Sequence, residues 1–219
     1  KYTRLDRKTR HAADMYINVL EQLGVTDVAN HGLHIETCKD WNDEVSRFYE
    51  SQGVMPRDKI IGFNIGSAVP EKRWPAERFA DVADYFGNKG YKTVFFGGPM
   101  DLDMVKPVVA QMKTSPIVAT GAFKLGPLAA AMKWCDLLIT NDSGPMHVAI
   151  SQGVPIVALY GPSNPFFYGP YQAKSIVLES MDHYEIGKSM KQVIKEGKYK
   201  GISVITEEQV IKAAETLLQ

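Results

Sequence analysis

The sequence predicts an α/β protein with a Rossmann-like parallel sheet and helices on both faces. Two observations predict this class. Short apolar runs alternate with segments of helical periodicity from about residue 59 onward, and glycine, proline or polar residues follow most of these runs. Strands that alternate with helices form βαβ units, whose right-handed crossovers produce a parallel sheet. With 219 residues, of which 45% are hydrophobic, the chain is long enough to bury a substantial core.

Each element follows from a local pattern. The apolar runs predict strands over 60–65, 92–96, 116–119, 136–140, 155–160 and 175–178. Helical spacing predicts helices over 11–23, 43–52, 75–89, 101–112, 127–134, 145–152 and 207–218. Pro75 suits a helix start, Gly24 and Gly90 suit helix ends, and Thr206 suits an N-cap. Residues 30–39 are predicted as an additional short strand, and 181–201 as a lysine-rich surface loop with partial helix.

The chain divides by pattern into two regions. Residues 1–57 are predicted to be an interdomain linker with packing helices, and they carry no recognisable chemistry. Residues 58–219 are predicted to form the Rossmann-like domain. The sequence starts at Lys1 without a methionine, so we expect that an earlier part of the protein precedes it.

Composition excludes several classes of function. A formal net charge of zero gives no basis for a nucleic-acid partner. No apolar run approaches the roughly 20 residues of a membrane helix, and the basic, polar N-terminus is no signal peptide, which favours a cytoplasmic location. Cys38 and Cys135 lack metal-ligand spacing, so we expect two free thiols and no metal site.

Four polar loops follow predicted strands, and in a parallel sheet all of them lie at one edge. They are residues 66–75, 97–101, 141–147 and 160–165. The third reads Asn-Asp-Ser-Gly-Pro-Met-His and opens a helix, whose free N–H groups and dipole suit a phosphate. The combination predicts a nucleotide site at the carboxyl ends of the strands.

Single residues in the first two loops allow specific roles, each with an alternative. The ammonium of Lys72 suits phosphate oxygens, although a lysine taken alone is more often a solvated surface residue. Ser67 can donate to the same phosphate or serve as an ordinary turn serine. Asp101 can accept ribose hydroxyls, or it can be an acid favoured by a helix N-terminus.

The third loop supplies the other candidates. Asp142, Ser143 and Gly144 open the helix; Gly144 permits close approach of a ligand, whereas Ser143 is also a normal N-cap. His147, one turn on, can reach a phosphate or sugar or be a structural histidine. The sequence contains no Gly-x-Gly-x-x-Gly fingerprint, which argues against a Rossmann oxidoreductase, and no arrangement of nucleophile and base.

These motifs closely resemble glycosyltransferase family 9, the ADP-heptose:lipopolysaccharide heptosyltransferases. The resemblance rests on Gly-Ser at 66–67 with Lys-Arg-Trp-Pro at 72–75, Gly-Gly-Pro at 97–99, Asp-Ser-Gly-Pro-Met-His at 142–147, and Ala-Leu-Tyr-Gly-Pro-Ser-Asn-Pro at 158–165. It is strong over residues 59–170 and weak at the ends. It implies the GT-B architecture of two Rossmann-like domains facing a cleft, with residues 58–219 as the C-terminal, sugar-nucleotide-binding donor domain.

The resemblance also implies roles. Lys72 and Ser67 would hold the diphosphate, and Asp142, Ser143 and Gly144 the phosphates and donor sugar, with His147 close by. Asp101 takes the place of an acidic ribose ligand, although the family often has a longer glutamate there. The loop from Gly97 and the turn near Met132 would receive adenine.

The implied reaction transfers heptose with inversion from ADP-heptose, the donor substrate, to a lipopolysaccharide core acceptor. It needs no cofactor and no essential metal, and intact relatives act at the cytoplasmic face of the inner membrane, which implies peripheral association with that membrane. The family's base belongs to an N-terminal acceptor domain with no counterpart in the 219 residues, so we expect this chain to bind nucleotide without catalysing transfer alone. Alternatives are another GT-B enzyme using a UDP-sugar, either a transferase or an epimerase, and a non-catalytic nucleotide-binding module.

Overall fold

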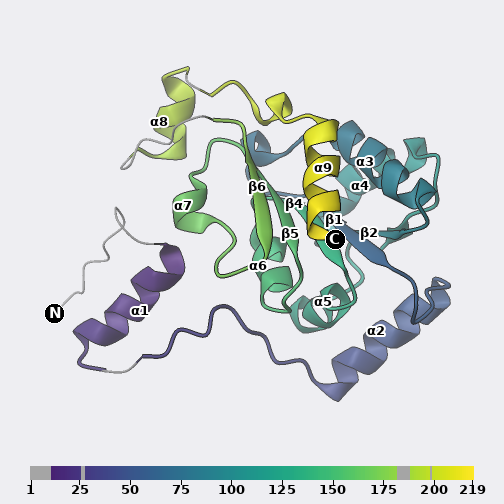
Figure 1. Ribbon diagram of the computed structural model, residues 1–219, viewed down its shortest axis with the longest axis horizontal. Helices are drawn as coiled ribbons and strands as arrows, with labels where there is room; N and C mark the ends of the chain where they lie inside the picture. Colours follow the sequence, from purple (N-terminus) through teal and green to yellow (C-terminus); the bar gives the residue numbers. More distant parts are fainter. Residues whose placement is uncertain (1–10, 26–27, 182–187, 198) are drawn as a thin grey trace.

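A computed structural model describes residues 11–25, 28–181, 188–197 and 199–219. In this part of the chain a six-stranded parallel sheet has the order β3-β2-β1-β4-β5-β6 (Figure 1). The strands are β1 (Ile60–Asn64), β2 (Lys92–Phe96), β3 (Ile117–Val118), β4 (Leu137–Asn141), β5 (Ile156–Tyr160) and β6 (Ser175–Glu179). The predicted α/β class and all six predicted sheet strands are confirmed.

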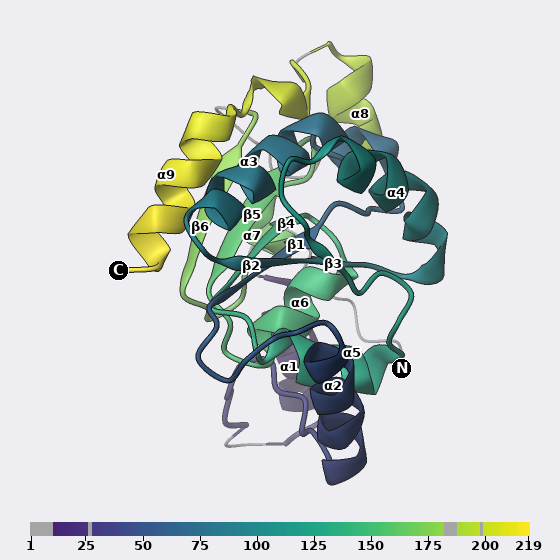
Figure 2. The same ribbon diagram turned by 90° about the vertical axis from the view of Figure 1, so that its right-hand side faces the viewer.

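Helices cover both faces of the sheet (Figure 2). On one face lie α3 (Ala76–Asn88), α4 (Leu102–Gln111) and α9 (Glu207–Leu217), and on the other α2 (Lys39–Ser51), α5 (Leu125–Met132) and α6 (Gly144–Ile150). Shorter or peripheral helices are α1 (Ala12–Gln22), α7 (Pro165–Tyr168) and α8 (Met190–Lys195), with 3-10 turns at η1 (Pro70–Lys72), η2 (Pro99–Asp101) and η3 (Ile202–Val204). The seven predicted helices are confirmed, with ends that move by at most four residues.

The two faces of the sheet build two apolar cores because successive side chains of a strand point in opposite directions. In β1, Ile61 and Phe63 pack under α3, α4 and α9, whereas Ile60 packs toward α2, α5 and α6. All five residues of β1, β4 and β5 are buried. Burial on both faces explains why these strands read as continuous apolar runs rather than alternating ones.

The strand order creates one topological switch point. From β1 the chain proceeds outward through β2 and β3, then returns to the other side of β1 and proceeds outward through β4, β5 and β6. Adjacent crossovers therefore diverge between β1 and β4, and the region beyond the carboxyl ends of these two strands is where open α/β sheets form their ligand crevice.

The predicted strand at 30–39 is wrong. Residues 28–38 are extended but pair with no strand in the described chain; Leu33 and Ile35 instead pack on the core, and Gln152 Nε2 donates to Ile35 O at 2.8 Å. Apolar side chains alone cannot distinguish a paired strand from an extended segment held by side-chain packing. Helix α7 was not predicted, and the loop predicted at 181–201 contains α8, with residues 182–187 and 198 outside the described ones.

The region before residue 58 is joined to the sheet through α2. Val45 and Tyr49 are fully buried in the core that α5 and α6 share, and the Tyr49 hydroxyl donates to Ala131 O at 3.1 Å. Helix α1 has a different environment: Met15 is buried, whereas Tyr16 and Leu23 are each 69% exposed. The division of the chain at residues 57 and 58 stays a prediction.

Candidate functional site

Polar side chains line the floor of the crevice at the switch point. Asn64, the last residue of β1, donates from Nδ2 to Ser143 Oγ at 2.7 Å and to Thr140 Oγ1 at 3.1 Å. Asn141, the last residue of β4, donates from Nδ2 to Ile65 O at 2.8 Å. These bonds tie the loop after β1 to the loop after β4, so the two predicted phosphate loops meet.

An ion pair joins the same two loops. Lys72 Nζ lies 2.5 Å from Asp142 Oδ2, and the side chains are 18% and 6% exposed. The hydroxyl of Ser163, from the loop after β5, donates to the same oxygen at 2.6 Å. Three loops far apart in sequence therefore converge on one buried carboxylate, where each bond is stronger than it would be in water.

Lys72 is held in place by the residues that follow it. It ends the 3-10 turn η1, and Arg73 Nε donates to Ser67 O at 2.8 Å. Trp74 is buried, with its backbone N–H bonded to Asn141 Oδ1 at 3.0 Å and its indole N–H bonded to Ile205 O at 2.9 Å. The Lys-Arg-Trp-Pro segment thus anchors its tryptophan in the core and presents its lysine to the crevice.

The remaining residues of the third loop lie at the start of α6. Ser143 is the N-cap of α6, but its side chain makes no capping hydrogen bond; its hydroxyl donates to Asn141 O at 3.3 Å instead. A Cβ atom on Gly144 would meet no heavy atom within 4 Å, so the space beside this residue is open. Ser67 faces the same loop, with Oγ 3.4 Å from Asp142 O.

His147 lies one turn into α6. Burial lowers the pKa of His147, the carboxylate of Asp142 works in the opposite direction, and His11 adds a further lowering. A lowered pKa keeps the imidazole neutral at pH 7, where it can donate one hydrogen bond and accept another.

Asp101 lies at the same edge but is engaged locally. Its Oδ2 accepts from Gly98 N at 2.8 Å, and a Cβ on Gly66 would lie 2.5 Å from its Oδ1. The carboxylate thus packs against the loops after β1 and β2 while stabilising the turn η2. This contact matches the helix-start alternative for Asp101, and its ribose role stays a prediction.

The predicted set is therefore brought to one edge of the sheet, but two partners were missed. Ser163 and Asn64 both bond to members of the set, and neither was predicted as a site residue. Asn64 could have been predicted, because a polar residue at the end of a fully buried strand indicates a site at that edge of the sheet. Ser163 carries no such signal, because serine is common in turns.

Two properties of the described residues bear on chemistry and location. They contain no group of three His, Cys, Asp or Glu side chains that could hold a metal ion. None of the described helices combines the length and the apolar character needed to cross a membrane. Both cysteines are free thiols, as predicted, and burial raises the pKa of Cys135.

The fold and the crevice define a Rossmann-like α/β protein with a polar site at its switch point. The chain belongs to glycosyltransferase family 9 (heptosyltransferase), whose sequence profile matches residues 2–200. It is 33% identical over 164 residues to lipopolysaccharide heptosyltransferase 2 of Escherichia coli K12, a match covering 73% of this chain and 47% of that protein. The predicted family is confirmed.

Solved structures agree with this assignment. The structure of a glycosyl transferase family 9 protein from Veillonella parvula DSM 2008 has 79% identity and a TM-score of 0.94, covering 100% of this chain and 62% of that one. The E. coli ADP-heptose lps heptosyltransferase II has 28% identity and a TM-score of 0.68, covering 84% and 53%. The predicted GT-B relationship is thereby confirmed. The chain spans about half the length of the curated relatives that it matches.

Proposed function

We propose that the crevice between β1 and β4 binds a nucleotide sugar, and that the chain is the donor-binding half of a heptosyltransferase. The observation that carries the proposal is the convergence of Lys72, Asp142 and Ser163 at the topological switch point of a family 9 chain. Switch points of parallel sheets are the usual ligand sites of such folds. The names of two relatives, a lipopolysaccharide heptosyltransferase and an ADP-heptose lps heptosyltransferase, support heptose as the sugar and ADP as its carrier.

In this proposal Lys72 and Ser67 contact the diphosphate, and the start of α6 at Ser143 and Gly144 receives its oxygens. Asp142 accepts hydroxyl groups of the donor sugar, with His147 beside it. Asp101 takes the ribose; this requires its carboxylate to bind the ribose hydroxyls while Oδ2 still accepts from Gly98 N. The open space beside Gly144 and the lack of a capping side chain at the start of α6 support the placement of the diphosphate.

In this proposal the residues of the site stabilise the nucleoside diphosphate as it leaves the sugar. When the bond between the anomeric carbon and the diphosphate breaks, negative charge grows on the departing oxygen. An ammonium and the positive end of a helix dipole that are already in place stabilise this charge more than they stabilise the bound donor, and only such a difference accelerates the reaction. We propose an inverting transfer to a lipopolysaccharide core, with no cofactor and no essential metal.

We assign no catalytic base to this chain, and we propose that it contributes donor binding rather than transfer by itself. We also propose that the protein acts in the cytoplasm, peripheral to the inner membrane, where a lipopolysaccharide acceptor is available. These proposals follow from the family to which the chain belongs and concern the whole protein.

The test is calorimetric titration of the chain with ADP and with UDP. We expect tighter binding of ADP, and we expect Lys72→Ala to weaken it by about 10- to 100-fold, since a hydrogen bond to a charged group contributes about 1.5–3 kcal/mol. We expect Asp142→Ala to weaken ADP binding as well, since the loss of the bonds that position Lys72 and Ser163 outweighs the removal of a competing carboxylate. Lys89→Ala is the matched control: it removes an ion pair of the same length, with Glu215, at the far end of α3.

Each other outcome has a definite meaning. Tighter binding of UDP would replace the proposal with a GT-B enzyme that uses a UDP-sugar, either a transferase or an epimerase. Equal effects of Lys72→Ala and Lys89→Ala would contradict the placement of the diphosphate. A chain that binds ADP but gives no transfer even in the intact protein would be a nucleotide-binding module.

A further inference from the structure

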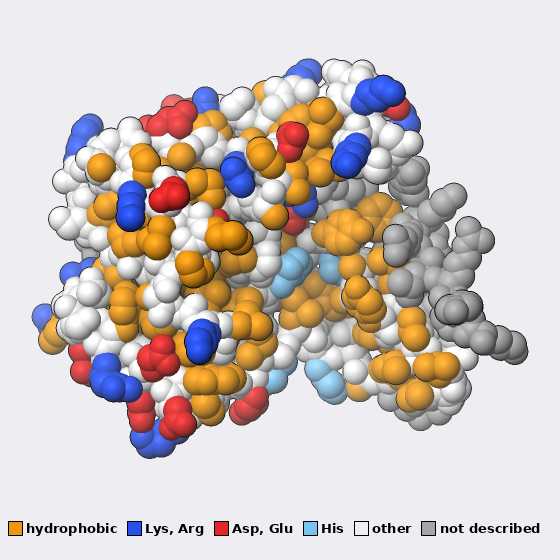
Figure 3. Space-filling model, turned by 180° about the vertical axis from the view of Figure 1, so that it is seen from behind, with side chains coloured by type: hydrophobic (Ala, Val, Ile, Leu, Met, Phe, Trp, Pro, Cys, Tyr) orange, Lys and Arg blue, Asp and Glu red, His pale blue; other side chains and the backbone are white. Residues whose placement is uncertain are grey.

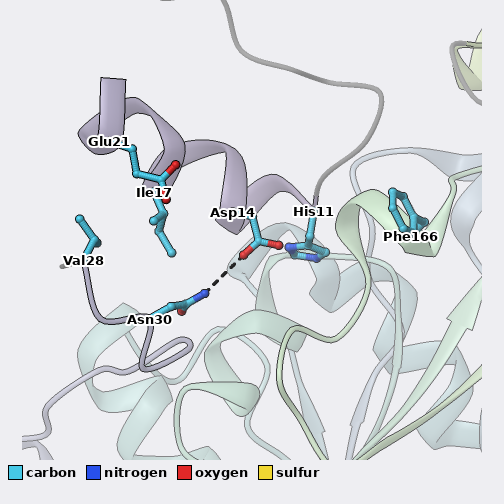
Figure 4. A pocket seen from close by; sticks show the side chains of 7 residues that line it. All are labelled: His11, Asp14, Ile17, Glu21, Val28, Asn30 and Phe166. Carbon is cyan, nitrogen blue, oxygen red and sulfur yellow. Dashed lines mark hydrogen bonds between the residues drawn. The ribbon is translucent and has the colours of Figure 1, made fainter. Parts of the chain in front are cut away.

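Polar side chains in different parts of the molecule differ in their access to water. A cavity of about 550 Å³ lies beside α1, where Asp14 and Asn30 bond to each other and Glu21 is exposed (Figure 4). Seen from behind, the molecule has a hollow between the lobe that carries α1 and the rest (Figure 3). Polar atoms in such a hollow can bond to water, whereas a polar atom buried under the crevice depends on the protein for its hydrogen bonds.

Asn64, the last residue of β1, is buried in this way. The residue is 1% exposed, and Nδ2 of its side chain donates to Ser143 Oγ at 2.7 Å and to Thr140 Oγ1 at 3.1 Å. These partners fix which end of the amide faces them. The hydroxyls of Thr140 and Ser143 both donate to Asn141 O, at 2.7 and 3.3 Å. Their hydrogens are thereby used, so each hydroxyl accepts from the nitrogen of the amide.

The carbonyl group of the same amide is unpaired. Asn64 Oδ1 is buried and accepts no hydrogen bond from any residue that the structure describes. Asn141, the last residue of β4, differs in this respect: its Nδ2 donates to Ile65 O and its Oδ1 accepts from Trp74 N. A buried carbonyl without a partner is unfavourable for folding. Asn64 therefore lowers the stability of the fold relative to a residue that lacks this group.

We propose that Asn64 is a positioning residue for the donor and acts on it through Ser143. The inference rests on the proposed function, which places Ser143 at the diphosphate. Because the Ser143 hydroxyl accepts from Asn64 and donates to Asn141 O, it is held in a position where it makes no capping hydrogen bond to α6. The same bond fixes the loop after β4 against the end of β1, whose own loop carries Ser67 and Lys72.

An asparagine suits this role because its amide nitrogen carries two hydrogens. They reach an acceptor in β4 and an acceptor in the loop after it, whereas the hydroxyl of a serine or threonine could donate to one of them only. The unpaired carbonyl is the other half of the same amide. Positioning and stability therefore make opposite demands on Asn64, as is common at ligand sites.

The experiment compares stability with affinity in Asn64→Val. Valine is favourable in strands and removes both groups of the amide, so we expect the midpoint of urea unfolding to stay the same or to rise. We expect the affinity for ADP, measured by calorimetry, to fall about 5- to 20-fold, since Ser143 is no longer held in place. A residue with a merely structural role would not lower the affinity while the fold keeps its stability.

Two variants are matched controls. Asn141→Val removes an amide whose two groups are both paired, so we expect its midpoint of unfolding to fall. Ser151→Ala removes a buried hydrogen bond of 2.6 Å to Val148 O at the other end of α6. Its midpoint should also fall, and its affinity for ADP should equal that of wild type.

A double variant tests the route through Ser143. We expect Ser143→Ala to weaken ADP binding, and we expect the combination of Asn64→Val with Ser143→Ala to bind ADP within about twofold of Ser143→Ala alone. Losses that multiply in the double variant would overturn the proposal. So would an unchanged affinity in Asn64→Val, or a midpoint that falls as far as in Asn141→Val.

Amide hydrogen exchange without nucleotide separates this proposal from the proposed function. Asn64→Val should exchange faster than wild type in residues 141–147, and Ser151→Ala should not. If wild-type chain binds ADP and Asn64→Val exchanges like wild type, only the role of Asn64 fails. If exchange is faster but wild-type chain does not bind ADP, Asn64 positions the loop, and its role toward a donor is overturned together with the proposed function.

Discussion

At the scale of residues, the site is organised around a single oxygen atom. Asp142 Oδ2 accepts from Lys72 at 2.5 Å and from Ser163 at 2.6 Å while the carboxylate is 6% exposed. A buried charge is stable only when its bonds are satisfied, so each donor also fixes the orientation of the other. Ser163 is therefore a positioning residue, which acts on the ligand through Asp142.

Ser163→Ala should weaken ADP binding about 2- to 10-fold, because a lost hydrogen bond is worth about 0.5–1.5 kcal/mol. Ser163→Thr keeps the hydroxyl and should retain most of the affinity. Calorimetry on the two variants checks this. An equal loss of affinity in the alanine and threonine variants would contradict a role for the hydrogen bond.

His147 should make stability depend on pH. Burial holds the pKa of His147 below its usual value of 6.5 in the folded protein. As the pH falls below about 6.5, the unfolded chain takes up a proton at this residue and the folded chain does not, so the free energy of unfolding decreases.

In His147→Gln this contribution is absent. The loss of stability between about pH 7.5 and 5.5 should therefore be smaller than in wild type, as measured by urea unfolding at both pH values. His34→Gln is the control, since its side chain is 69% exposed. An identical pH dependence in wild type and His147→Gln would contradict the buried, neutral imidazole.

At the scale of elements, one glycine sets the distance between α2 and α5. A Cβ atom on Gly126 would lie 2.5 Å from Cζ2 of Trp41, so the indole rests directly on the backbone of α5. Such overpacking costs about 1–3 kcal/mol, and Gly126→Ala should lower the free energy of unfolding by this amount. Chemical denaturation checks it, with Gly144→Ala as the control because its Cβ would meet no neighbour. Equal free energies of unfolding for the two variants would mean that α2 moves away from α5 without loss of stability, and that Gly126 does not set their distance.

The reach of sequence analysis also varies by element. The strand at 92–96 has the predicted ends, because Gly90 before it and Gly97 after it interrupt the pattern. The extended segment at 30–39 was mistaken for a strand because pairing is a tertiary property. Helix α7 has four residues, which is too few to display a helical period.

For the candidate site, the sequence predicts which loops contribute but not how their side chains contact each other. Lys72 and Asp142 lie in loops that follow parallel strands, and strand polarity alone places such loops at one edge. Their direct ion pair and the contribution of Ser163 depend on how three loops fold back toward each other, which no local pattern encodes. Asp101 shows what the sequence cannot decide. An acid that stabilises a helix start and an acid that binds ribose are the same residue type at the same position, so the pattern does not distinguish the two roles.

At the scale of the whole molecule, two apolar cores hold a sheet whose polar edge carries the proposed chemistry. The positive charge at this edge comes from Lys72 and the start of α6 rather than from any group of metal ligands in the described residues. We therefore expect the affinity for ADP in excess EDTA to equal that in the presence of Mg²⁺ within about twofold. Calorimetry under both conditions checks this. A large loss of affinity in EDTA would show that a cation bridges the diphosphate and the protein.

The pairing of Lys72 with Asp142 has a consequence for competition among the anions of a cell. An ammonium that already has a counter-ion binds inorganic phosphate weakly. The phosphate would have to displace the carboxylate, and it makes no other contacts that would compensate for this loss. A nucleotide sugar brings a base, a ribose and a hexose-like ring to offset the same displacement. The internal counter-ion therefore acts as a filter by size: it discriminates against small anions that share the charged group of the intended ligand.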